Sequence, residues 1–474
     1  MRQKIDKFFK ISERGSNIKN EIIGGLTTFF AVAYSVVTNP NQITGFNFEG
    51  EMGAIWNAVY VASILAAVVG TLMYAFHARL PYVQACGMGL NSFFFVSFIL
   101  PALASDSAIE GYKEGLCIIL LSGVVFLLLS ISGAREYIAR SLPDCLKKSI
   151  SAGIGLFIAF IGLQNKEVGI IQPNQYTLVQ LFDFRAAIEG KGFFDAWCAV
   201  APVVLALLGV LLIAVLEWKR IKGSVMIVMA SITVLYYLTT WQLPSFDMSQ
   251  VGQSFVDFAD IGLFGAFEGF GVFAGGIGAV LNSLMLVLTF CLVDMFDTIG
   301  TLYATGAQTG MMDENGDPLD MDKSMTCDSV ATVAGSLLGT STCTTVVESS
   351  AGIAAGARTG LASLVTAGCF AVCLFLTPLA AIVPACATAP ALIYVGALML
   401  GNFAKVNMND ISEAVPAFLA LIMMPLTYSI SNGIAIGSIA YIVIALLRGK
   451  YTKKDIILTV VAILFIIRFF TVSM

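Results

Sequence analysis

The sequence predicts an all-α polytopic membrane protein with about 14 transmembrane segments in two inverted seven-helix repeats. The 474 residues are 58% hydrophobic and 12% charged, and the mean hydropathy is +0.86. A soluble domain has roughly 45–50% apolar and 25% charged residues. Apolar runs near the roughly 20 residues that cross a bilayer recur along the chain. One run in each half is interrupted by polar residues.

Residues 1–20 form a polar, basic segment, in which Ile5, Phe8 and Phe9 at helical spacing indicate a short interfacial helix. The last apolar run, 455–472, does not fit an even count of segments, so we expect an interfacial or extra helix over 455–474. The other apolar segments are expected at 22–38, 54–76, 82–100, 113–131, 149–163, 196–216, 223–240, 277–304, 324–339, 341–357, 360–383, 387–402, 413–430 and 432–447.

The distribution of Lys and Arg places the N-terminus in the cytoplasm. Basic residues crowd the first twenty positions and return in loops that face the same side on an alternating count. The stretch FFAVA resembles a signal-peptidase site, but the polar leader before it is too long for a typical signal peptide. We therefore expect a multi-pass protein of the plasma membrane, with the lipid bilayer as its main partner.

Composition argues against several other kinds of partner. The net charge of −5 belongs to a surface that mostly meets lipid, and no nucleic acid is expected to bind. His77 is the only histidine, so a His-based metal site is excluded and no metal is expected. The ten cysteines include no CxxC pair and are expected to be buried as small hydrophobic residues.

The polar connection 310–324 has two possible interpretations. Asp313, Asn315 and Asp317 are spaced like the start of a calcium loop, but Pro318 stands where that loop needs Gly. A cytoplasmic turn built on Asn315 and Gly316 is therefore predicted instead.

The two halves share a layout. GMGLN (87–91) breaks the third segment, and TSTCTTVVES (340–349) breaks the tenth, at similar distances from the start of each half. Seven segments per half is an odd number, so the halves must have opposite topology. Interrupted helices at corresponding positions mark the binding site in inverted-repeat transporters, which predicts a site where the breaks meet.

Four carboxylates lie within apolar segments: Asp294, Asp297, Asp328 and Glu348. Each costs roughly 2.5–3.5 kcal/mol at a helix centre, so the set must face protein or water. Asp294 and Asp297 are three residues apart and share a helix face. Burial without a cation favours the neutral form of a carboxyl group, which suits proton coupling. A purely structural role remains an alternative for Asp297 or Asp328.

The breaks supply complementary chemistry. Gly89 permits irregular backbone ahead of a helix that resumes near Asn91, and Phe93 offers an aromatic face. Thr345 and Val346 lie in a β-branched run that favours an extended piece. Backbone donors, amides, hydroxyls and carboxylates together match a flat, neutral heterocycle better than an inorganic anion.

Four stretches carry a family resemblance: ACGMGLNSFF (85–94), VDMFDTIGT (293–301), CDSVATVAGSLLGTSTCTTVVESSAG (327–352) and PAFLALIMMPLTYSISNGIAIG (416–437). They closely resemble the AzgA-like branch of the nucleobase:cation symporters, the adenine, guanine and hypoxanthine permeases. The resemblance implies a core domain, 21–131 with 277–384, and a gate domain, 149–240 with 386–448. It also implies short extended pieces at both breaks and a possible homodimer.

By the same resemblance, Asn91, Asp294 and Glu348 are expected to contact a purine, and Asp328 to support the site. Cys86 stands where the family commonly has Pro, and Val346 stands where an aromatic residue is frequent.

The resulting hypothesis is a proton-coupled symporter that imports purine nucleobases such as adenine, guanine or hypoxanthine by alternating access. The proton is expected on Asp294 or Glu348, with no other cofactor and no enzymatic activity. Alternatives are transport of xanthine or uracil, or of anions on the same fold. A membrane-embedded Mg-dependent enzyme is disfavoured, because the apolar segments lack the basic residues that a diphosphate requires.

Overall fold

The structure is a computed structural model that describes residues 2–103, 107–132, 143–165, 168–174, 178–221, 223–241, 248–309, 311–314, 317–452 and 455–471. Within these ranges helices dominate, and the named strands form two short two-stranded sheets. Eight helical stretches are long and apolar enough to cross a membrane, and shorter apolar helices accompany them. The predicted all-α membrane class is confirmed.

The first half runs from the N-terminal helix to the segment before the second repeat. Its elements are α1 (Arg2–Phe9), α2 (Ile18–Val32), α3 (Ser35–Ile43), α4 (Glu51–Met73), η1 (Tyr74–Ala78), β1 (Gln84–Cys86), α5 (Met88–Phe94), η2 (Phe95–Ile99), α6 (Leu100–Ala102), α7 (Ala108–Ser132), α9 (Asp144–Leu163), β2 (Ile171–Asn174), β3 (Leu178–Leu181), α10 (Phe184–Ile188), α11 (Phe193–Trp218), α12 (Ser224–Thr240), α13 (Ser249–Asp257), η4 (Phe258–Gly262), η5 (Gly265–Phe267) and η6 (Gly269–Phe273).

The second half begins with the longest helix. Its elements are α14 (Ile277–Thr309), α15 (Met321–Leu338), β4 (Cys343–Thr345), α16 (Ser349–Ala354), α17 (Gly360–Cys373), α18 (Thr377–Ala381), α19 (Ala385–Leu400), η7 (Gly401–Lys405), α20 (Ile411–Leu426), α21 (Ile430–Leu447) and α22 (Asp455–Thr471). Each predicted apolar segment coincides with a helix or with a strand followed by a helix.

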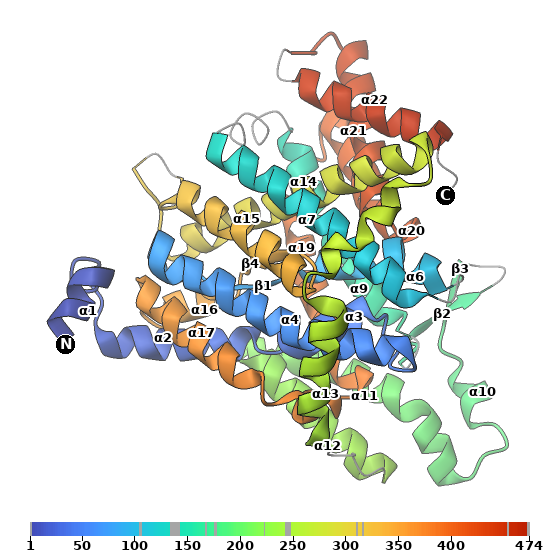
Figure 1. Ribbon diagram of the computed structural model, residues 1–474. Coiled ribbons are helices and arrows are strands. Elements are labelled where there is room, and N and C mark those ends of the chain that lie inside the picture. Colours follow the sequence, from blue (N-terminus) through green and yellow to red (C-terminus); the bar gives the residue numbers. More distant parts are fainter. Residues whose placement is uncertain are drawn as a thin grey trace.

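The helices pack in two groups. In one, α4 and α7 lie against α15 while α2 lies against α16 and α17 (Figure 1). In the other, α9 packs on α19 and α20, and α11 packs on α12 and α19. The strands β1 and β4 lie near the middle of the first group, and α22 packs on α21 and α14 (Figure 1). The boundaries expected for the core and gate domains stay a prediction.

Close helix packing depends on small residues, as is common where hydrophobic burial cannot drive helix association. A Cβ on Gly25 of α2 would lie 2.5 Å from the carbonyl oxygen of Ala362, so the backbones of α2 and α17 approach each other closely. The last turn of α15 ends at Gly339, whose φ of 103° lies in the left-handed region that glycine adopts without strain. This ending turns the chain into the second break.

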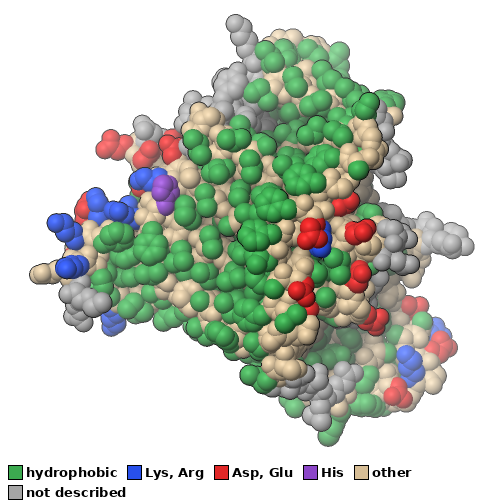
Figure 2. All heavy atoms as spheres, in the orientation of Figure 1, with side chains coloured by type: hydrophobic (Ala, Val, Ile, Leu, Met, Phe, Trp, Pro, Cys, Tyr) green, Lys and Arg blue, Asp and Glu red, His purple; other side chains and the backbone are tan. Residues whose placement is uncertain are grey.

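Hydrophobic, basic and acidic side chains occupy different regions of the outer surface. Figure 2 shows hydrophobic side chains covering the middle of one face, with Lys and Arg gathered toward the end that carries α1 and Asp and Glu gathered toward the opposite side. Phe30, Leu128 and Leu211 are among the large apolar side chains that are more than half exposed. Such a broad apolar surface fits contact with lipid.

Two connections have local structure of their own. The hairpin β2–β3, which the sequence analysis did not predict, pairs Ile171 with Leu181 in the connection before α11. The backbone N–H of Asp317 donates to the side chain of Asp313 at 2.9 Å, which closes the connection between α14 and α15. The predicted turn at Asn315 and Gly316 lies outside the described residues.

At the start of α20, Asp410 caps the helix and pairs with Arg448 at the end of α21, 2.7 Å away. The hydrogen bonds from Ser412 and Arg448 lower the pKa of Asp410 to about 2. This exposed pair therefore connects the last two helices of the second group at one surface of the protein.

Candidate functional site

The two broken segments meet in an antiparallel pair of strands. β1 and β4 pair Gln84 with Thr345 and Cys86 with Cys343, and all six strand residues are buried. The ladder continues at one end, where the N–H of Val346 donates to the carbonyl of Val83 at 3.3 Å. Irregular backbone is tolerated at membrane depth only when its polar groups are satisfied, and each break satisfies the other here. The extended pieces expected at the breaks are present.

Asp328 of α15 ties both strands to α14. Its Oδ1 accepts hydrogen bonds from Gln84 Nε2 at 3.1 Å and from the backbone N–H of Thr345 at 2.9 Å. Its Oδ2 accepts a hydrogen bond from Thr298 Oγ1 at 2.6 Å. The side chain is fully buried, so its oxygens are engaged by protein groups. This arrangement fits the supporting role expected for Asp328.

Asp294 of α14 is linked to β4 through Thr332. Its Oδ2 accepts a hydrogen bond from Thr332 Oγ1 at 2.7 Å, and that hydroxyl lies 3.1 Å from the carbonyl oxygen of Cys343. Its Oδ1 is buried and receives no hydrogen bond from any described residue. A buried carboxylate oxygen without a donor is costly, so Oδ1 is the oxygen of Asp294 whose capacity to accept a hydrogen bond is unused.

Glu348 ends the second break, just ahead of α16. Its Oε1 accepts a hydrogen bond from the hydroxyl of Tyr34 at 2.7 Å, and its side chain is half-buried. Asp297 is half-buried on the face of α14 that carries Asp294, and it interacts electrostatically with Glu348. The pair places two acidic groups beside the partly open end of the break.

Asn91 lies in the first turns of α5 and joins the two breaks to α3. Its Nδ2 donates to Gln42 Oε1 at 3.2 Å, and its Oδ1 accepts a hydrogen bond from the hydroxyl of Ser341. Gln42 also donates to Ser92 Oγ at 3.2 Å. In this conformation the Asn91 amide is held by protein partners from α3 and from the second break.

The remaining predicted site residues lie near the paired strands or at the contact with α9, and each makes a different kind of contact. Thr345 turns its hydroxyl toward Asp328 and toward Tyr74, which is 2.7 Å away. A Cβ on Gly89 would meet Ile154 of α9, so the glycine allows the two helix groups to touch. Phe93 is 1% exposed and its ring packs on a neighbouring aromatic ring of α14. Val346 is half-buried beside the strands.

Sequence reasoning missed the contribution of α3. The predicted first segment stopped at residue 38, but the helix continues to Ile43 after a break near Ala33 and Tyr34. Asn39 donates to Thr340 Oγ1 at 3.1 Å, so α3 also contacts the start of the second break. The signal was the run TNPNQ (38–42), in which buried polar residues follow an apolar stretch.

The site has an acidic character without a matching cation. None of the ion pairs among the described residues involves Asp294, Asp297, Asp328 or Glu348. Such a set can accept hydrogen bonds from N–H groups and can hold a proton, but it offers no attraction to an anion.

The permease family model matches residues 19–436, which is most of the chain. The chain belongs to this family. The predicted resemblance to the nucleobase symporters is confirmed by this match together with the guanine/hypoxanthine and adenine permeases among the relatives.

Named relatives of this permease align along nearly their whole length. It is 38% identical to the guanine/hypoxanthine permease PbuO of Bacillus subtilis, over 98% of this chain and 99% of that protein. It is 34% identical to the adenine permease AdeP of Escherichia coli, over 98% of this chain and 95% of that protein. Among solved structures, the transmembrane domain of the cyanobacterial bicarbonate transporter BicA matches with a TM-score of 0.57 and 15% identity, covering 88% of this chain and 97% of that one. At this identity the likeness concerns the fold alone.

Proposed function

We propose that this permease transports purine nucleobases across the membrane together with a proton. The names of its relatives, guanine/hypoxanthine and adenine permeases, support a purine as the cargo. A transporter also accounts for the fold, because interrupted segments that meet at the centre of a helix bundle are the usual substrate site of inverted-repeat transporters.

The observation that carries the proposal is the buried, unpartnered Oδ1 of Asp294 beside the paired strands β1 and β4. Glu348 lies nearby, at the half-buried end of the second break. Purines present ring and exocyclic N–H groups, which such oxygens can accept. A neutral heterocycle also avoids the repulsion that an anion would meet among acids without a cation. Asn91 is proposed to hydrogen-bond to the purine when its amide exchanges its bond to Gln42 or Ser341 for one to the ligand.

Proton coupling follows from the same chemistry. A carboxylate that is buried in an apolar site lacks hydration, so burial favours its protonated form. A purine N–H can donate to the carboxylate and replace part of the missing hydration. Asp294 or Glu348 is the proposed proton carrier. Asp328 is proposed to position the strands, since its hydrogen bonds already engage both oxygens.

Alternating access is proposed to move the first helix group against the second. The site lies in the first group. The helix α5, which follows β1, and the helix α14, which packs on α7, both contact α9 of the second group. Gly89 faces Ile154 at this contact, so a small residue is placed where the groups would slide.

Orientation and assembly complete the proposal. The basic residues near α1 support a cytoplasmic N-terminus by the positive-inside rule, and the cell membrane is the proposed location. The exposed apolar surface is assigned to lipid, with a homodimer possible through the second group. No enzymatic activity is assigned.

Uptake of radiolabelled adenine, guanine, hypoxanthine, xanthine and uracil tests the proposal, in cells that lack their own permeases and with or without a protonophore. We expect uptake of a purine, its loss with the protonophore, and its loss in Glu348→Gln. Glu110→Gln is the matched control, because it neutralises an exposed carboxylate of α7.

Surface expression of each variant must be measured in parallel. Uptake that persists after Asp294 and Glu348 are both neutralised would contradict the assignment of the proton and the site. Uptake of sulfate or bicarbonate in place of any base would favour the anion alternative.

A further inference from the structure

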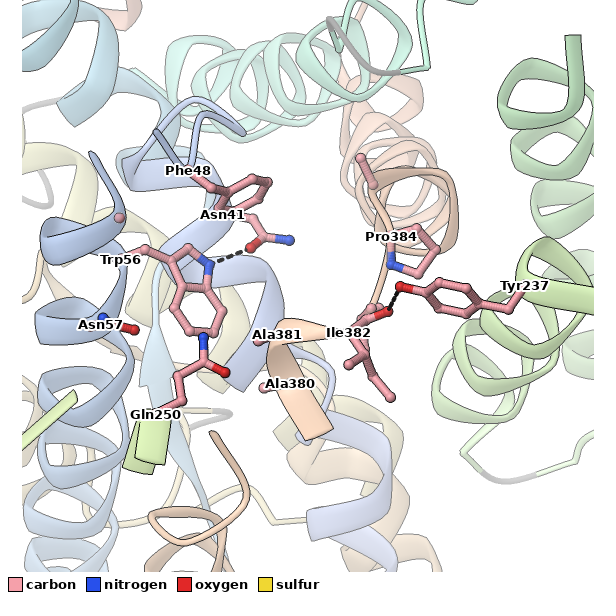
Figure 3. A pocket seen from close by; sticks show the side chains of 13 residues that line it. Asn41, Phe48, Trp56, Asn57, Tyr237, Gln250, Ala380, Ala381, Ile382 and Pro384 are labelled. Atoms are coloured by element: carbon pink, nitrogen blue, oxygen red, sulfur yellow. Dashed lines mark hydrogen bonds between the residues drawn. The ribbon is translucent and has the colours of Figure 1, made fainter. Parts of the chain in front are cut away.

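A pocket of ≈ 460 Å³ lies apart from the carboxylate cluster. Its walls come from α3, α4, α12, α13 and the segment 380–385, and so from both helix groups (Figure 3). None of the residues that line it carries a charge. Its volume falls within the roughly 300–1,000 Å³ typical of small-molecule sites.

One wall presents an amide with a free donor. Asn41 is 2% exposed, and its Oδ1 accepts a hydrogen bond from Trp56 Nε1 at 2.6 Å. Its Nδ2 donates to no described residue, and Figure 3 shows this nitrogen turned toward the open space between α3 and the segment 380–385. This N–H opens on the pocket and can donate to an acceptor that a ligand brings.

Aromatic rings and a further amide complete the lining. The Trp56 ring stacks on Tyr60 and meets Phe48 edge to face, with centroid distances of 5.5 Å and 6.4 Å. Gln250 of α13 points its amide toward Trp56 (Figure 3). Across the space, the hydroxyl of Tyr237 donates to the carbonyl of Ile382 at 2.9 Å, which fixes the opposite wall.

These features select a class of ligand. The aromatic side chains favour a flat ring, while the Asn41 N–H can donate to a carbonyl or ring-nitrogen acceptor. The Gln250 amide can donate or accept, and the absence of lining charges favours a neutral molecule. A nucleobase has all of these properties.

The pocket is connected to the carboxylate cluster through α3. Asn41 faces the pocket, and the next residue, Gln42, accepts the hydrogen bond from Asn91. Adjacent α-carbons are only about 3.8 Å apart. A single turn of α3 therefore contacts the pocket through Asn41 and the Asn91 side of the carboxylate cluster through Gln42. With the N-terminus inside, α3 ends at the outer side of the membrane.

We propose that this pocket is an entry subsite, in which a nucleobase binds from outside before it reaches Asp294 and Glu348. The inference rests on the proposed function, since it assigns the same cargo to a second place in the protein. Binding here would require no proton, because no acidic or basic side chain lines the pocket.

Protection of an introduced cysteine tests the subsite in the full-length protein. Gln250→Cys is labelled with a membrane-impermeant thiol reagent from outside, with and without adenine or hypoxanthine. Gly252→Cys is the control on the same helix, because a side chain there meets open space and does not line the pocket. Phe48→Cys, at a position that is 43% exposed, reports from another wall. The wild-type chain measures labelling of the native cysteines.

The experiment is repeated in a Glu348→Gln background, in which transport is expected to stop. At a base concentration of ten times the dissociation constant, about one pocket in ten remains free, so labelling at Gln250→Cys and Phe48→Cys should slow about tenfold. Labelling at Gly252→Cys should not change. The same protection is expected in both backgrounds.

Labelling that is unaffected by any base, in a permease that transports one, would overturn the subsite alone. Protection that disappears with Glu348→Gln would also overturn it, because the effect would then report the transport cycle and not occupancy of this pocket. An absence of both uptake and protection for every base would contradict the proposed function itself.

Discussion

Substitutions of Asp328 separate a side chain that holds the strands from one that serves the substrate. In Asp328→Ala, Gln84 Nε2 and the backbone N–H of Thr345 lose the acceptor that lies 3.1 Å and 2.9 Å away. Each buried donor left without a partner costs about 1–3 kcal/mol, so the two together cost about 2–6 kcal/mol. Thr298 keeps its contact with Thr344 Oγ1 at 2.7 Å and adds little to this sum.

Asp328→Asn is the matched variant. Its carbonyl oxygen can still accept from Gln84 and Thr345, while its amide can donate to the hydroxyl of Thr298. The expected loss is therefore that of about one ordinary hydrogen bond, roughly 0.5–1.5 kcal/mol. The difference between the variants is large beside the 5–15 kcal/mol by which proteins are typically stable.

Thermal unfolding of the purified permease in detergent, followed by the fraction that remains monodisperse, measures the difference. We expect Asp328→Ala to melt well below the wild type, and Asp328→Asn to melt near it and to retain uptake. An alanine variant as stable as the wild type would refute the role of Asp328 in holding the breaks together. An asparagine variant that is stable but inactive would show that the carboxylate acts on substrate or proton.

Three further predictions concern the neighbouring contacts. Cys86 Sγ and Cys343 Sγ lie 3.6 Å apart across the paired strands, so a mild oxidant should produce a disulfide-linked peptide detectable by mass spectrometry; failure to form it would contradict the strand register. Tyr34→Phe removes the hydroxyl bond to Glu348, worth about 1.5–3 kcal/mol for a charged acceptor, and should lower purine uptake at unchanged expression; normal uptake would exclude a role for this bond. Glu21→Ala removes the carboxylate that accepts backbone N–H groups at the start of α17, and should lower the stability measured by thermal unfolding by about 0.5–2 kcal/mol, whereas an unchanged melting temperature would argue against this cap.

Much of the fold could be predicted because the bilayer imposes local rules. A membrane segment must be apolar along its length and must satisfy its own backbone, so length and composition identify it without tertiary information. The broken segments were visible for the same reason, since GMGLN and TSTCTTVVES violate those rules. The run TNPNQ violates them too, but the end of a segment and a buried polar turn look alike in sequence, so the sequence does not distinguish them.

Sequence alone shows which residues must be buried at a cost, since an acidic side chain in an apolar segment signals a site wherever its partners lie. It did not determine what each of them does. Asp294 and Asp328 are both fully buried carboxylates, yet Asp328 has donors on both oxygens and Asp294 has a free one.

This difference arises from the tertiary fold, because the donors to Asp328 come from β1, β4 and α14, which are far apart along the chain. The entry pocket has the same origin, since α3 and α12 are brought face to face only by the packing of the two helix groups. Apolar periodicity is a property of neighbouring residues, whereas a hydrogen-bond partner or a cavity wall is fixed by distance in space.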